Sequence, residues 1–220
     1  DTIITMGTRA VDFFRNKGID TDFHIVSGGI DTMRFRANEE PKLFDLIMTG
    51  RLVRIKRIDV FLQAVCLIMK ELPGVSAVIV GDGMLREQLQ RLACDLGIDR
   101  NVSFVGHQND VENWLKRSKI FVLTSDSEGL SLSMMEAMMC GLPAIVSDVG
   151  DLGDLVEDGV NGYLVPRRSP ELFADRIIEL LMDERKLKAF SQAARHSSLR
   201  YETQATTRQW DNIIANCRIS

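Results

Sequence analysis

Short apolar runs alternate with longer amphipathic segments along most of the chain. Between the runs, hydrophobic residues recur at intervals of three and four positions, as at Ile58, Phe61, Leu62 and Val65, and this spacing predicts helices. The runs themselves have the length of β-strands and occupy residues 44–49, 75–80, 102–105, 120–123, 144–147 and 162–165. The alternation predicts an α/β domain in which a parallel sheet is covered by helices on both faces.

The beginning of the chain departs from this regular alternation. Residues 1–35 are expected to form two short strands, at 2–5 and 23–26, with a helix between them. The polar stretch 34–42 has the composition of a connector. We therefore place a domain boundary after residue 35 and expect a single domain over residues 36–200.

The last segment, residues 201–220, is predicted to be an amphipathic helix. Trp210, Ile213, Ile214 and Cys217 recur at helical spacing and form one apolar stripe. We expect this stripe to dock on protein and to be partly exposed if its partner is absent.

Glycines and polar residues follow the predicted strands. In parallel sheets, ligands bind beyond the carboxyl ends of the strands. The stretches that fall at this edge are Gly50-Arg51, Gly81-Asp82-Gly83, Gly106-His107, Ser127-Glu128-Gly129 and Ser147-Asp148. Their recurrence indicates a ligand site rather than a purely structural domain.

The stretch after the run 120–123 is the most informative of these. A helix that begins near Ser131 and ends at Gly141 would direct unpaired backbone N–H groups and its positive dipole end at the strand tip. Such a helix terminus binds phosphate groups. Gly129 lacks a Cβ and so allows an anion to approach the backbone closely.

Glu136 lies inside this helix among leucine and methionine residues. A carboxylate in such an apolar setting is costly unless it has a hydrogen-bond partner, and ribose hydroxyls of a nucleotide would serve. The alternative is a glutamate on the one solvated stripe of a core helix. The stretch by itself leaves both interpretations open.

Two cations follow the first strand of the sheet. Arg51 and Lys56 are expected at the binding edge, where they would suit a pyrophosphate. Lys56 and Arg57 are predicted in the first turn of the next helix, where cations oppose the helix dipole, and this favours an anionic partner. The alternative is a pair of solvated basic residues.

Three other motifs carry less weight. The run from Gly81 to Arg86 lacks the third glycine of a dinucleotide fingerprint, which excludes a typical NAD site. Asp20-Thr-Asp22 is expected to be a turn rather than a metal site, because aspartate readily serves turns. His107 follows a strand at the ligand edge, although a single histidine is more often a loop residue than a catalyst.

Composition narrows the classes of function. Apolar residues make up 45% and charged residues 26%, which supports a sizeable core, and the net charge of −4 without a basic cluster argues against nucleic-acid binding. No apolar stretch has the length of a transmembrane helix. The chain begins at Asp1, so we expect a segment upstream. Four separated cysteines are expected to be buried thiols in a reducing compartment, namely Cys66, Cys94, Cys140 and Cys217.

Taken together, these residues resemble the retaining GT-B glycosyltransferases of family 4. The resemblance is strong over residues 43–185, and residues 1–35 are more loosely similar to the end of the family's N-terminal domain. The resemblance implies a Rossmann-like domain that forms the C-terminal, donor-binding half of a GT-B fold. The matching stretches are Gly50 to Asp59, Val80 to Gly83, Phe104 to Gly106, Ser125 to Pro143 with its Glu-x7-Glu spacing from Glu128 to Glu136, and Asp158 to Val165.

The resemblance also implies roles for individual residues in binding a nucleotide-diphosphate sugar, most simply a UDP-sugar. Arg51 and Lys56 would contact the diphosphate, Glu136 would accept from the ribose, and Glu128 would face the donor sugar as the catalytic residue. No metal or other cofactor is implied, because cations and the helix dipole neutralise the leaving diphosphate. The neighbourhood of Val105 to His107 would hold the base, and the backbone amides of Gly129, Leu130 and Ser131 would hold the sugar and phosphate. Gly50 is a further implied contact of the nucleotide sugar.

The sequence departs from the family pattern at three places near the expected sugar site. Gly150-Asp151 replaces the usual Gly-Gly, Asp154 replaces a later glutamate, and Ser27-Gly28 replaces the common Asn-Gly. We therefore expect altered loop geometry near the sugar and an unaltered nucleotide site.

The leading hypothesis is a glycosyltransferase, present here as its donor-binding half. Residues 1–35 would be the remnant of an acceptor domain, which would bind a glycan or lipid in a longer parent protein. We expect the isolated chain to be inactive. The parent protein is expected to be cytoplasmic, and the alternative is a peripheral position at the inner face of the membrane through its N-terminal domain. The alternatives are a sugar-nucleotide 2-epimerase and a non-catalytic nucleotide-binding module.

Overall fold

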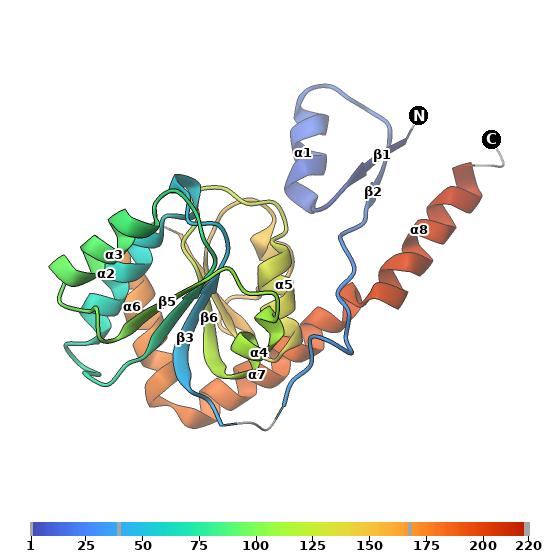
Figure 1. The fold of residues 1–220 in the computed structure, drawn as a ribbon. Coiled ribbons are helices and arrows are strands. Elements are labelled where there is room, and N and C mark those ends of the chain that lie inside the picture. The colour runs from blue at the N-terminus through green and yellow to red at the C-terminus, as the bar shows by residue number, and fades with distance from the viewer. Residues whose placement is uncertain (1, 39–40, 167–168, 218–220) are drawn as a thin grey trace.

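The computed structural model describes residues 2–38, 41–166 and 169–217. Its centre is a six-stranded parallel sheet with the strand order β5-β4-β3-β6-β7-β8 (Figure 1). The strands are β3 (Phe44–Thr49), β4 (Ala77–Val80), β5 (Val102–Gly106), β6 (Ser118–Leu123), β7 (Ala144–Ser147) and β8 (Gly162–Val165). Every strand predicted from the apolar runs over residues 44–165 is present.

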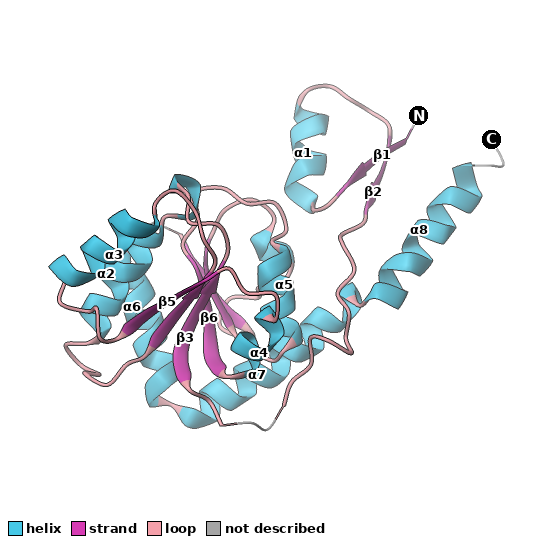
Figure 2. Cartoon of the chain, viewed as in Figure 1, coloured by secondary structure: helices cyan, strands magenta, loops and turns pink. Residues whose placement is uncertain are grey.

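Helices cover both faces of this sheet, as predicted (Figure 2). One face packs against α2 (Ile58–Ile68), α3 (Arg86–Asp95) and α6 (Pro170–Met182). The other packs against α4 (Val111–Lys116), α5 (Leu132–Met139) and α7 (Glu184–Ser198). The sequence pattern did not single out α7, because its apolar stripe is limited to a few residues such as Phe190 and Ala194 within a largely polar helix.

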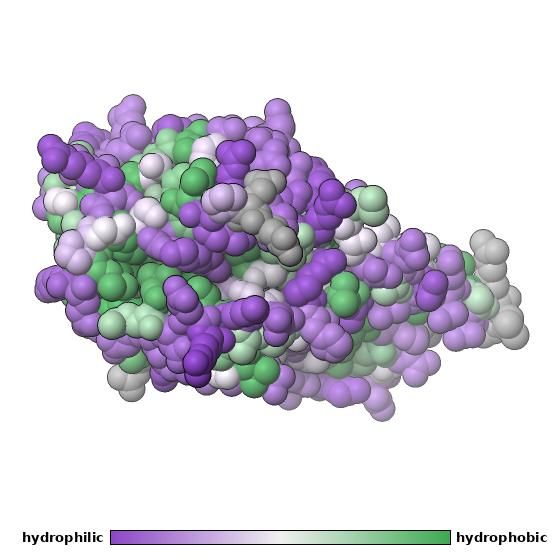
Figure 3. All heavy atoms as spheres, turned by 90° about the horizontal axis from the view of Figure 1, so that it is seen from below, coloured by the Kyte–Doolittle hydropathy of each residue, from purple (hydrophilic) through white to green (hydrophobic). Residues whose placement is uncertain are grey.

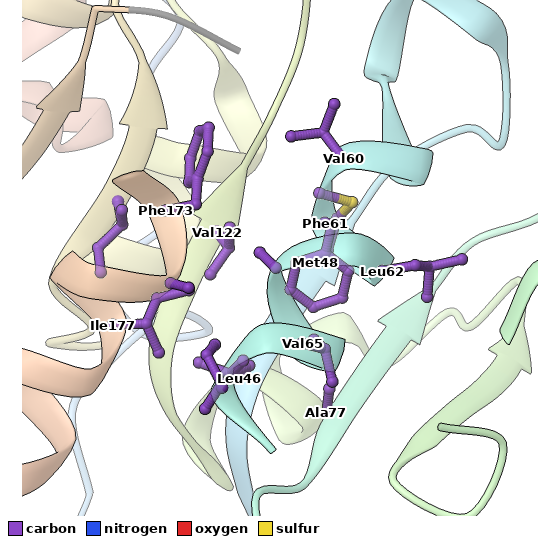
Figure 4. Packing of buried hydrophobic residues seen from close by; sticks show 14 of the residues in the cluster. Leu46, Met48, Val60, Phe61, Leu62, Val65, Ala77, Val122, Phe173 and Ile177 are labelled. Atoms are coloured by element: carbon purple, nitrogen blue, oxygen red, sulfur yellow. The ribbon is translucent and has the colours of Figure 1, made fainter. Parts of the chain in front are cut away.

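The alternation of side chains along the strands creates two separate cores. In β3, Leu46 and Met48 point to the face covered by α2, whereas Ile47 points to the face covered by α5. Figure 4 shows Leu46, Met48 and Val122 facing Phe61 of α2. Because both faces are buried, each strand is apolar at nearly every position, and this accounts for the continuous apolar runs in the sequence.

The N-terminal residues form a separate βαβ unit. β1 (Thr2–Thr5) and β2 (Asp22–Ile25) pair in parallel as a two-stranded sheet, with α1 (Thr8–Asn16) between them. Figure 1 shows this unit above the carboxyl-terminal edge of the large sheet. Asp20 lies in the loop that precedes β2, whereas Asp22 begins that strand.

The C-terminal helix α8 (Thr203–Cys217) extends from the domain beside the connector that follows β2 (Figure 1). A bridge between Ile30 and Glu202 joins the two segments. Of the predicted apolar stripe, Ile213 is buried, whereas Trp210 and Ile214 are exposed. The side chain of Cys217 lies outside the described residues. Among the described helices, none is long and apolar enough to cross a bilayer.

The cysteines differ in burial, so the expectation of four buried thiols was wrong in part. Cys140 is buried, and this burial raises the pKa of its thiol to about 12. Cys66 is half-buried. Cys94 is exposed, because it lies on the outer face of α3 while Leu89 and Ala93 fill the inner face.

Figure 3 views the molecule from the edge at which the strands begin, where apolar and polar side chains are interspersed. A shallow groove of about 330 Å³ lies at this edge, with Lys42, Leu181 and Lys188 in its lining. None of the predicted site residues contributes to it. They gather at the opposite edge.

Candidate functional site

The carboxyl ends of the strands border a cleft of about 420 Å³. Four of the predicted site residues line it, namely Gly50, Arg51, His107 and Glu136. A smaller adjoining space is lined by Gly50, Arg51 and Lys56. Gly81 and Asp82, which the sequence also places at the ligand edge, line the cleft as well. The remaining lining residues had no predicted role, and most are close neighbours in sequence of predicted ones: Thr49, Val80, Gln108, Val111 and Ser133.

The ends of three strands are joined tightly at the floor of this cleft. Gly50 N donates to Val80 O at 3.0 Å, and Gly81 N donates to Gly106 O at 2.8 Å. Gly81 has φ +142°, and a Cβ at this position would lie 1.9 Å from Gly50 O. Only glycine permits this approach, so the loop that carries Arg51 depends on Gly81.

Lys56 and Arg57 do not lie in the first turn of a helix, so that prediction was wrong. Lys56 ends a short 3-10 turn (Arg54–Lys56), and Arg57 is the N-cap of α2 with φ 46°. Arg57 forms salt bridges with Asp59 and Asp126, and the hydrogen bond to Asp59 is the main cause that raises the pKa of its guanidinium. Its charge near the helix terminus is thus compensated by carboxylates of the protein.

Lys56 and Glu128 meet each other in the site. Lys56 Nζ and Glu128 Oε1 are 2.5 Å apart, and their side chains are 19% and 11% exposed. Ser125 Oγ donates to the same carboxylate oxygen, also at 2.5 Å. A cation predicted to hold phosphate and the predicted catalytic carboxylate therefore form one hydrogen-bonded cluster at the end of β6.

The helix after this cluster begins where the sequence predicted. α5 starts at Leu132 with Ser131 as its N-cap, whose side chain accepts from Met134 N. Leu130 is buried in the core, whereas a Cβ on Gly129 would meet open space. The backbone at Gly129 is therefore open to a ligand, just before the N-terminus of α5.

Glu136 lines the cleft one turn further along α5, beside Ser133. Burial raises the pKa of its carboxyl group, the nearby Arg34 opposes this shift, and the carboxylate of Glu112 adds to it. Within the described part of the chain, the Glu136 carboxylate has no hydrogen-bond or salt-bridge partner. A half-buried acceptor that faces a cleft suits a hydroxyl-bearing ligand.

The residues expected near a base lie at the end of β5, with Val105 in the strand and His107 directly after it. His107 lines the cleft, and Gln108 Nε2 donates to Val105 O at 2.8 Å, so the side chain of Gln108 braces this turn. Asp82 faces the same part of the cleft. Its pKa is lowered chiefly by the amide of Gly83 and also by Arg86, 2.8 Å away.

The departures from the family pattern affect how the N-terminal unit contacts the site. The N-cap of α1 is Gly7, which provides no side-chain cap. Instead, Asp154 Oδ2 accepts from Thr8 N at 2.8 Å and Asp151 Oδ1 accepts from Arg9 N at 2.7 Å. These carboxylates satisfy the free amides of the α1 N-terminus from more than 140 residues away.

The loop with Asp151 also packs on the loop that carries Glu128. Gly150 has φ +54°, and a Cβ there would lie 1.7 Å from Glu128 O. Gly28 lies near the start of α5, with Leu132 Cδ2 3.0 Å from its Cβ position.

Across the described residues, no group of three or more His, Cys, Asp or Glu could hold a metal ion.

Comparisons with known proteins show the family to which this chain belongs. The family described as "Glycosyl transferases group 1" matches residues 29–197. A poly(ribitol-phosphate) alpha-N-acetylglucosaminyltransferase of Staphylococcus aureus (strain COL) is 30% identical over 167 residues, which are 75% of this chain and 34% of that protein.

Two solved structures are also similar over nearly the whole chain. Pneumococcal O-GlcNAc transferase GtfA, in complex with UDP and GlcNAc, has a TM-score of 0.87 and 26% identity, and the match covers 98% of this chain and 45% of GtfA. The G117R mutant of S. aureus TarM, in a complex that includes UDP, has a TM-score of 0.87 and 25% identity over 96% of this chain and 43% of TarM. This chain thus spans less than half of each of these enzymes. It belongs to the glycosyl transferases group 1 family and has the fold of the C-terminal, donor-binding domain of its GT-B enzymes.

Proposed function

We propose that this chain binds a UDP-sugar and is the donor half of a retaining hexosyltransferase. The observation that carries the proposal is the cleft itself, where Arg51, the N-terminus of α5 and the carboxylate of Glu136 lie at one sheet edge. This carboxylate has no partner among the residues that the structure describes. These groups complement a diphosphate and a ribose in chemistry. That two similar enzymes were solved with UDP supports the choice of nucleotide.

The site residues contact different parts of the UDP-sugar. Arg51 and Lys56 contact the diphosphate, together with the backbone of Gly50 and the amides at the α5 N-terminus. Glu136 accepts from the ribose, and Glu128 faces the sugar as the catalytic residue. The turn at Val105 and His107 holds the base.

In a longer parent protein, an acceptor domain would complete the cleft. We assign residues 1–35 to that domain and its connector, residues 36–200 to the donor domain and residues 201–220 to the terminal helix. The acceptor would be a glycan or lipid, and the parent would be cytoplasmic or peripheral to the inner face of the membrane. The isolated chain should not transfer sugar, because positioning an acceptor in line with the donor contributes on the order of 7–11 kcal/mol to such reactions.

Calorimetric titration of the chain with UDP-, GDP- and ADP-sugars tests this function. We expect measurable binding of a UDP-sugar, weakened because only one wall of the cleft covers the ligand. A chain that binds no nucleoside diphosphate at millimolar concentration would contradict the proposal and favour a non-catalytic module.

Glu136→Gln should reduce ribose-dependent binding without destabilising the fold. The pKa of Glu136 is raised in the folded state, so the free energy of unfolding of the wild type falls as the pH rises from the ordinary glutamate pKa to the raised one. Glutamine avoids this cost, and the free variant should be at least as stable as wild type at neutral pH. Thermal melts with and without UDP measure both effects. Equal stabilisation of the two proteins by UDP would argue against the ribose contact.

Chelation should leave nucleotide binding intact. The proposed neutralisation of the diphosphate relies on Arg51, Lys56 and the α5 N-terminus rather than on a metal ion. We expect the same UDP affinity in EDTA as in magnesium or manganese buffers. Binding that disappears in EDTA and returns with either ion would show that a metal participates.

A further inference from the structure

The end of β6 holds the segment around Lys56 through several bonds. Thr124 Oγ1 donates to Lys56 O at 3.1 Å and to Arg57 O at 2.8 Å. Asp126 N donates to Ile55 O at 2.8 Å. The backbone of Lys56 is thus fixed relative to the start of the Glu128 loop, which leaves side-chain rotation as the main freedom of its ammonium group.

The Lys56 side chain lies between two possible partners. Its Cε atom is 3.6 Å from the Cβ position of Gly50, so its stem runs beside the loop proposed to hold the diphosphate. Its ammonium group nevertheless points to Glu128, with which it forms a largely buried ion pair. The Glu128 carboxylate is thus paired with a cation that the proposed diphosphate contact requires.

Building on the donor-binding function proposed above, we propose that Lys56 exchanges partners when the donor binds. Its ammonium group leaves Glu128 Oε1 and pairs with the diphosphate. Ser125 is the positioning residue that keeps Glu128 in place after this exchange, because its hydroxyl already donates to the same oxygen. Ser125 is fully buried, so water does not compete for this bond.

The two bonds to Glu128 leave one oxygen of its carboxylate for the sugar. Both bonds converge on Oε1 of Glu128, and Oε2 has no partner among the described residues. A carboxylate held through one oxygen can present the other in a fixed direction. Without Ser125, the exchange would leave Glu128 free to rotate, and the contact with the sugar would be lost.

The exchange predicts that removing the negative charge of Glu128 strengthens the binding of bare UDP. In Glu128→Gln the ammonium group of Lys56 no longer has to leave a charged partner, and we expect UDP to bind about tenfold more tightly, the equivalent of one modest charge pair. Calorimetry with UDP measures this directly, and far-UV circular dichroism confirms that the variant is folded. Unchanged or weaker UDP binding by a folded Glu128→Gln would overturn the exchange.

A double-mutant cycle separates exchange from general repulsion between Glu128 and phosphate. In a Lys56→Ala background no exchange is possible, so Glu128→Gln should change UDP affinity by less than about threefold. A tenfold gain in that background would mean that repulsion alone acts, and the exchange would be wrong. If neither wild type nor any variant binds UDP, the donor-binding function fails and the exchange fails with it.

Ser125→Ala tests the positioning role through a different quantity. We expect its UDP affinity to stay within about twofold of wild type, while the additional affinity for UDP-N-acetylglucosamine over UDP disappears. Ser118→Ala is the matched control, because Ser118 is an equally buried serine at the other end of β6 with one bond, to Trp114 O at 2.8 Å. Equal losses for UDP and UDP-N-acetylglucosamine, or the same selective loss in Ser118→Ala, would refute the role.

Discussion

Arg51→Ala should weaken UDP binding by roughly tenfold to over a hundredfold, because a hydrogen bond to a charged group contributes about 1.5–3 kcal/mol. Arg51 is exposed at the cleft, and its side chain has no hydrogen-bond or salt-bridge partner among the described residues, so its guanidinium is available to a diphosphate without breaking another contact. Lys56→Ala should have a smaller effect. Its loss of a phosphate contact is offset because no pair with Glu128 has to be broken.

Arg54→Ala is the matched control for this prediction. This substitution removes the same charge three positions after Arg51. Arg54 itself does not line the cleft. Calorimetry with UDP and with uridine measures the contrast, and uridine affinity should change little in all variants. The phosphate role would be disproved if uridine and UDP lost affinity equally, or if Arg54→Ala weakened UDP as much as Arg51→Ala.

Gly150→Ala should lower the free energy of unfolding by more than about 3 kcal/mol, a loss typical of substitutions that create severe local clashes. Two effects combine at this position. The backbone is in the left-handed region, with φ +54°, and the added Cβ would lie 1.7 Å from Glu128 O. The clash is with backbone rather than with a flexible side-chain end, so the loop that carries Glu128 must move.

Gly159→Ala separates these two effects. Gly159 also has a positive φ, +77°, but nothing lies within 4 Å of its Cβ position. We expect a loss of about 1–2 kcal/mol, the ordinary cost of the left-handed conformation for a residue with a Cβ. Urea denaturation of both variants measures the difference. Equal losses of unfolding free energy in the two variants would show that the predicted clash between residue 150 and the Glu128 loop does not occur.

A consequence for binding follows if Gly150→Ala remains folded at low temperature. Displacement of the Glu128 loop should reduce the affinity for a UDP-sugar more than the affinity for UDP, because Glu128 is proposed to face the sugar. The loop after β7 also carries Asp151, which caps α1. The loop after β7 thus contacts both the N-terminal unit, through Asp151, and the Glu128 loop, through Gly150.

The amino-acid sequence determined the sheet, most of its helices and the edge at which the ligand is expected. These features follow from local pattern, since burial on both faces makes strands such as β3 continuously apolar and amphipathic helices repeat at three and four positions. The N-terminus of α5 could likewise be placed near Ser131, because capping depends on neighbouring residues. The helix α7 was not predicted, because its few apolar positions give only a weak local pattern.

Only the tertiary structure decided which distant side chains meet. The bond between Lys56 and Glu128 joins positions 72 residues apart, and the bond that caps Thr8 with Asp154 spans 146 residues. Arg57, in its left-handed conformation, likewise contacts Thr124 and Asp126, which are remote in sequence. Local pattern records whether a residue is buried and in which period, but it does not record which remote carboxylate a cation reaches. That partner is set by how the chain closes, and it determines whether Lys56 is free for a diphosphate or already paired.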